Sequence, residues 1–180
     1  MRLIVKLTGL MGLAVWLAAC AVHAPSQPIQ SPERAMVFGR IIAPETITKI
    51  EFREYGKFYI PPFRIPPRVL VFENGDFMVE NLKPGTYYIA AVYSRFKDYT
   101  FVKDNRTAYQ QMIRVEPGEL QFAGSFVVHE VPDGTRFRKK VVLRKVRKPS
   151  ERDVLRNMYE VTHGTGWQDR IDRRLTELQM

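Results

Sequence analysis

The side chains best suited to catalysis or metal binding are few and scattered. The chain has one cysteine, Cys20, and three histidines, at positions 23, 129 and 163. A zinc site needs about four closely placed nitrogen, sulfur or oxygen ligands, and no two histidines are close in sequence. Nucleophilic catalysis needs a base and an orienting acid beside a hydroxyl, and Ser125 with His129 and Glu130 is too generic to indicate it. We therefore expect no metal, no cofactor and no enzymatic activity, with an unrecognised hydrolase as the weakest alternative.

Positive charge is the more prominent chemical feature. The formal net charge is +9, and residues 136–148 hold eight cations. Those expected to contact an anion are Arg136, Arg138, Lys139, Lys140, Arg144 and Lys145. Such residues can protect an edge strand from pairing with other chains. They can also bind an anionic surface, such as lipopolysaccharide phosphates, membrane headgroups or an acidic protein. Both interpretations stay open. In a strand, Arg138, Lys140 and Arg144 would lie on the face opposite Phe137, Val141 and Leu143.

The first 19 residues have the layout of an export signal. Arg2 and Lys6 precede an apolar run over residues 7–17, which is shorter than the roughly 20 residues that a membrane-spanning helix needs. Leu17-Ala18-Ala19-Cys20 then resembles the lipobox of bacterial lipoproteins. The resemblance implies cleavage before Cys20 and attachment of lipid to its thiol. The alternative is an ordinary secreted protein cut after Ala24, which Pro25 disfavours.

The lipobox resemblance implies a lipid-anchored protein of the cell envelope. Ala21, rather than Asp, follows the cysteine, which favours the outer membrane. Loss of Arg2 and Lys6 would leave a net charge of +7, and with a single cysteine no internal disulfide can form. A role in binding nucleic acid is not expected in that compartment. Residues 20–34, rich in Pro, Ser and Gln, are predicted to be a flexible tether.

Two turns organise the central part of the chain. Asn74-Gly75 between apolar runs is typical of a type I′ hairpin, and Lys83-Pro84-Gly85 of a second turn. Together they predict a β-meander over residues 69–95, with Gly75 and Gly85 at positive φ. Glu73 and Asp76, beside the first turn, are interpreted as solubilising residues.

Further strands are predicted over residues 35–42, 47–55, 111–115, 120–128 and 137–146, which makes seven or eight strands in all. Prolines in residues 60–67 confine that segment to an edge or a loop. In the fourth of these strands, Gly124 suggests a bulge or a close approach by another element. Alternation there places one set of residues on a single face: Leu120, Phe122, Gly124, Phe126 and Val128.

Three motifs resemble the carboxypeptidase-regulatory-like, or transthyretin-like, β-sandwich modules. They are Val37-Phe38-Gly39-Arg40-Ile41, Glu73-Asn74-Gly75-Asp76-Phe77 and Leu82-Lys83-Pro84-Gly85-Thr86-Tyr87-Tyr88-Ile89. The resemblance implies a mainly β fold, an Ig/prealbumin-like sandwich over residues 35–148. Such a scaffold supports many functions and specifies none.

Residues 149–180 have helical periodicity. Ser150 is a candidate N-cap, and apolar residues recur at helical spacing before and after His163-Gly164. We expect two short helices that fold back onto the sandwich and cover Trp167.

Together these features predict a lipid-anchored cell-envelope protein with a non-catalytic binding or structural β-sandwich module. Its expected partners are the membrane, through the lipid on Cys20, and an anionic envelope component or a protein. The alternative is an accessory subunit of an envelope assembly or export machine. The sequence does not identify the ligand.

Overall fold

The computed structural model describes residues 26–57, 65–101, 112–132 and 139–180, and these form a β-sandwich with two helices. One sheet has the order β3 (Val69–Val71), β4 (Asp76–Leu82), β1 (Ala35–Ile42), β8 (Leu120–Pro132) and β9 (Lys139–Val146). The other contains β2 (Ile47–Glu54), β5 (Gly85–Ser94), β6 (Asp98–Thr100) and β7 (Ile113–Val115). The sandwich prediction is confirmed. The described residues contain nine strands rather than seven or eight, because β6 lies in a stretch where no strand was predicted.

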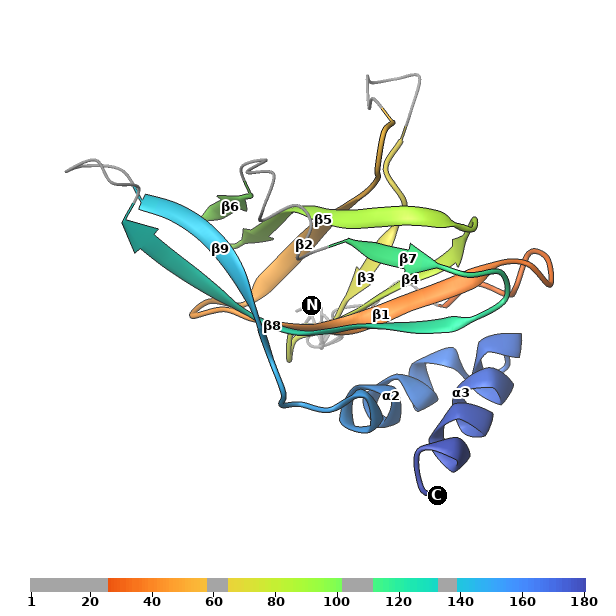
Figure 1. Cartoon of the computed structure of the whole chain (residues 1–180). Helices are drawn as coiled ribbons and strands as arrows, with labels where there is room; N and C mark the ends of the chain where they lie inside the picture. The colour runs from red at the N-terminus through yellow and green to blue at the C-terminus, as the bar shows by residue number, and fades with distance from the viewer. Residues whose placement is uncertain (1–25, 58–64, 102–111, 133–138) are drawn as a thin grey trace, which may run out of the picture.

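At β1 the five-stranded sheet is buried on both faces, which explains the apolar composition of this strand. Its Ala35, Met36, Val37 and Phe38 are all fully buried. Ala35 and Val37 pack in the core between the two sheets, whereas Met36 and Phe38 pack in a second core between this sheet and the helices. The helices cover the outer face of the five-stranded sheet in Figure 1. The molecule therefore has three layers and two cores.

The helical segment folds as predicted. Ser150 caps α2 (Glu151–Tyr159) in a capping box with Asp153, and a short 3-10 turn, η1 (Glu160–Thr162), leads to α3 (Gly166–Glu177). Trp167 is fully buried in the second core. No helix in the described part of the chain is long and apolar enough to span a bilayer.

The predicted meander is wrong, because β4 and β5 belong to different sheets. Asn81 has a φ of 56°, the left-handed conformation. Phe77 and Val79 point into the inter-sheet core, and strict alternation would place residue 81 there next. Instead, Leu82 is the next residue in that core. This local break in alternation lets the chain leave one sheet at Leu82 and enter the other at Gly85.

The bulge predicted at Gly124 is confirmed. The β1–β8 pairing shifts register between Phe122 and Gly124, with Gly124 at a φ of 120°. The extra residue reverses the faces of β8. Leu120 and Phe122 pack against the helices, whereas Ala123, Phe126 and Val128 enter the inter-sheet core. The expectation that Leu120, Phe122, Phe126 and Val128 share one face is therefore wrong.

Part of the predicted tether is bound to the domain. Residues 26–34 contact β4, α3 and the β7–β8 turn through hydrogen bonds and through the side chain of Ile29. Residues 26–34 are therefore part of the folded domain. Residues 20–25 lie outside the described residues.

Candidate functional site

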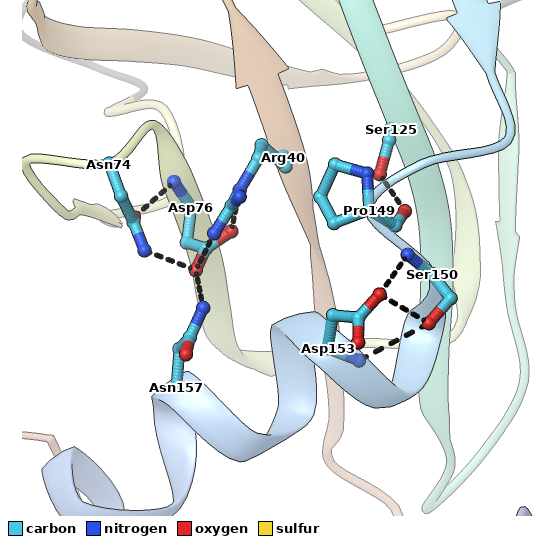
Figure 2. A network of polar contacts seen from close by, with 8 residues as sticks. All are labelled: Arg40, Asn74, Asp76, Ser125, Pro149, Ser150, Asp153 and Asn157. Atoms are coloured by element: carbon cyan, nitrogen blue, oxygen red, sulfur yellow. Dashed lines mark hydrogen bonds and ion pairs between the residues drawn. The ribbon is translucent and has the colours of Figure 1, made fainter.

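A buried polar cluster joins the sheet to α2, and Figure 2 shows its members. Asp76, fully buried, accepts hydrogen bonds from Arg40 Nε at 2.5 Å and Nη2 at 2.8 Å. The side-chain amide of Asn74 donates to Asp76 Oδ2 at 2.8 Å, and that of Asn157 donates to the same oxygen at 2.9 Å. The cluster therefore connects β1, β4 and α2, and the interpretation of Asp76 as a solubilising residue is wrong.

The geometry of this cluster fits a structural role better than an acid–base role. Both carboxylate oxygens of Asp76 are occupied by nitrogen donors. The hydrogen bond to Asp76 raises the pKa of Arg40, whose side chain is only 18% exposed. A buried charge whose hydrogen-bonding capacity is satisfied is costly to disrupt. The cluster therefore holds α2 in a fixed position on the sheet.

The α2 N-terminus forms a second polar group beside the first (Figure 2). Ser125 Oγ donates to the carbonyl of Pro149 at 2.6 Å, which ties β8 to the segment that enters the helix. The backbone N–H of Ser150 donates to Asp153 Oδ2 at 2.8 Å. Hydrogen bonds from Ser150 lower the pKa of Asp153. These contacts fix where α2 begins.

Arginines of α3 line a cleft of about 580 Å³ beside the start of β8. Arg170 donates to the carbonyls of Gly118 at 2.7 Å and Arg34 at 3.0 Å, and burial lowers its pKa. Arg174 is paired with Glu151 at 2.8 Å. Both arginines therefore already have partners within the protein.

Four of the predicted anion-binding residues, Lys139, Lys140, Arg144 and Lys145, belong to strand β9 at the edge of a sheet. Among the described strands, β9 pairs only with β8 and therefore ends the sheet. Leu143 is buried, and the partly buried Val141 packs against the inter-sheet core, whereas Arg144 is exposed on the opposite face. Lys145 is also exposed, and the end of its side chain lies over Gly124. Only the backbone of Lys139 and Lys140 is described, and Arg136 and Arg138 lie outside the described residues.

Both turn glycines have positive φ, as predicted, but their surroundings differ. Gly75 has a φ of 81°, and its N–H donates to Phe72 O at 2.9 Å. Asn74 is not at positive φ, so the turn is not of type I′. A Cβ at Gly75 would lie 2.2 Å from Ile41 O. Gly85 is nearly extended at 159°, and the closest atom to a Cβ there would be 3.5 Å away.

The other residues considered for chemistry are not brought together. Ser125 and His129 lie four residues apart in one strand, which is about 13 Å, and the Ser125 hydroxyl is used by Pro149. His163 is exposed. No group of three or more metal-ligating side chains occurs within the described ranges. Cys20 and His23 lie outside those ranges.

Comparisons with known proteins do not place the chain in a family. No family model matches it, and no curated protein matches it significantly. A solved structure of a protein from Bacteroides fragilis, proposed to act in cell adhesion, aligns with a TM-score of 0.30 and 7% identity. The alignment covers 64% of this chain and 46% of that one. Similarity at this level carries no argument about function.

Proposed function

We propose that this chain is a lipid-anchored protein of the bacterial cell envelope whose sandwich acts as a non-catalytic binding module. The observation that carries the proposal is the position of the sole cysteine. Cys20 follows a basic start, an apolar run and the residues Leu17-Ala18-Ala19. Acyl chains on Cys20 would hold the protein on a membrane, at about 0.8 kcal/mol per buried methylene. The outer membrane is the proposed location, because Ala21 follows the cysteine.

The exposed edge of β9 supports a binding role toward an anionic envelope component. Arg144, Lys145 and Arg147 are exposed and form no ion pair with another described residue. Cations of this kind attract phosphate-bearing surfaces, each contributing about 1 kcal/mol near an anionic membrane. Edge protection and anion binding are compatible, because both use exposed charge on the same strand.

Cell fractionation tests the anchoring. The wild-type protein should sediment with membranes and dissolve only in detergent, whereas Cys20→Ala should remain an uncleaved precursor. Replacing Cys20 should block cleavage of the signal segment, whereas replacing Ala24 should not. Equal solubility of the wild type and Cys20→Ala without detergent would refute the proposed anchor.

Binding to anionic vesicles or lipopolysaccharide tests the role of β9. The lipid-free protein should bind at low salt and lose binding near physiological salt, where charges are screened over about 8 Å. The variant Lys140→Gln/Arg144→Gln should bind much less. Lys57→Gln/Lys83→Gln is the matched control, because it removes two exposed cations elsewhere. Binding that does not depend on salt, or an absence of binding, would show that the charges of β9 only protect the edge strand.

A further inference from the structure

The N-terminal residues 26–30, here called the strap, lie in a groove between β4 and α3. The groove is formed by Glu80 and Asn81 near the end of β4 and by Gly166 and Trp167 at the start of α3. These residues are more than 50 positions from the strap in sequence, as the hydrogen bonds between them record. The strap forms neither a helix nor a strand, and Gln27, Pro28 and Gln30 are exposed.

The groove holds the strap mainly by its backbone. The side-chain amide of Asn81 accepts from Gln30 N at 2.9 Å and donates to Pro28 O at 3.1 Å. Trp167 Nε1 donates to Gln27 O at 3.0 Å. At the other end, Glu80 accepts from Gln27 N at 3.0 Å and from the hydroxyl of Ser26. Any extended segment presents such backbone groups, so these contacts do not require this particular sequence.

Ile29 is the side-chain anchor of the strap. It is partly buried and packs against the second core. A Cβ at Gly166 would lie 2.9 Å from Ile29 Cδ1, so the absence of a side chain there makes room for the anchor. Pro28, immediately before it, restricts the backbone to an extended form in advance of binding. The groove thus combines a backbone clamp with one apolar pocket.

We propose that this groove is a peptide-binding site and that the strap is its internal ligand. The external ligand is an extended segment of a partner protein in which a branched apolar residue follows proline. It would take the place of the strap, using the same clamp and pocket. The strap competes from within the same chain, at an effective concentration on the order of millimolar. A partner segment therefore displaces the strap only if it binds the groove more tightly than the strap does or is present at a higher concentration.

Displacement of the strap would also change the reach of the domain, a consequence that rests on the proposed lipidation of Cys20. With the strap bound, six residue steps separate Cys20 from Ser26, which span at most about 20 Å. With the strap released and residues 31–34 still held by Arg170 and Gly118, eleven steps separate Cys20 from Ser31, which span at most about 36 Å. Binding of a partner would thereby let the domain move away from the membrane.

Trp167 fluorescence tests the peptide site on the mature chain prepared without lipid, with Cys20→Ser. The sequence has two tryptophans, and because Trp16 lies in the signal segment, Trp167 is the only one in the mature chain. The variant Pro28→Gly/Ile29→Gly should expose the indole and shift its emission to the red. A synthetic peptide with the sequence of residues 25–31 should reverse the shift in a saturable way. The same peptide with glycine in place of proline and isoleucine should not. Ile65→Gly, at an isoleucine that is 84% exposed, is the control variant.

Hydrogen exchange on the wild-type chain provides a second readout that does not depend on the variant folding. Millimolar peptide should accelerate exchange of the Gln27 and Gln30 amides, because it removes their acceptors Glu80 and Asn81. Exchange at amides of β2 should not change. Unchanged exchange at Gln27 and Gln30 with millimolar peptide would overturn the proposal. So would an emission shift in the variant that the peptide does not reverse. Neither result depends on whether Cys20 is lipidated.

Discussion

Replacement of Asp76 by alanine should be among the most destabilising single changes outside the apolar cores. The change removes the acceptor of two hydrogen bonds from Arg40 and one each from Asn74 and Asn157. Arg40, only 18% exposed, would be left without its counter-ion. Removing one partner of a buried ion pair costs about 3–5 kcal/mol. In a domain of this size each kcal/mol lowers the Tm by about 2–4 °C, so a loss of roughly 10 °C is expected.

Urea unfolding followed by Trp167 fluorescence and circular dichroism measures this loss. Glu73→Ala is the matched control, since Glu73 is an exposed carboxylate in the same hairpin. It should change the free energy of unfolding by no more than about 0.5 kcal/mol. Asn157→Leu should cost about 1.5–3 kcal/mol, the usual loss for a hydrogen bond to a charged group. Its effect should be smaller once Asp76 is already replaced. A free-energy cost of Asp76→Ala no larger than that of Glu73→Ala would contradict a structural role for the buried cluster.

Three further changes test local features of the fold. Gly75→Ala should cost well over the roughly 1 kcal/mol expected from positive φ alone, because the new Cβ would meet Ile41 O. Gly56→Ala, also at positive φ but with nothing within 4 Å, isolates the strain, and equal urea midpoints for the two variants would exclude the clash. Ser150→Ala should cost about 1 kcal/mol through loss of the capping box, measured by thermal unfolding. Burial raises the pKa of Glu80, so the folded state binds its proton more tightly and the free energy of unfolding should fall as pH rises above about 4. Glu80→Gln should flatten that part of the pH profile, and an unchanged slope would contradict the assignment.

Local sequence patterns predicted where the helices, turns and strands occur better than they predicted which strands pair with each other. The helices, the cap at Ser150 and the bulge at Gly124 depend on residues close in sequence, and all three were predictable. The turn at Lys83-Pro84-Gly85 was also recognisable, but turn residues do not show whether the strands they join pair with each other. The transfer between sheets depends on Asn81 in the left-handed conformation, which the sequence does not specify.

The buried cluster and the strap depend on contacts that no local pattern contains. Asp76 follows Asn74-Gly75, a setting typical of an exposed turn, and its partner Asn157 lies 81 residues away. In β4, Asp76, Met78 and Glu80 alternate onto the face that the helices cover, which is apparent only once that face is known to be buried. Residues 26–34 have the composition of a linker, and their binding depends on Asn81 and Trp167.

Lipidation of Cys20 is the central claim, and metabolic labelling tests it directly. Cells that express the protein would be given labelled palmitate, and the purified product would be examined by intact mass spectrometry. The account predicts label in the wild type, with a mass equal to residues 20–180 plus the acyl groups, and an unlabelled, uncleaved Cys20→Ala variant. An unlabelled wild-type protein that begins after Ala24, or that retains residues 1–19, would contradict the claim.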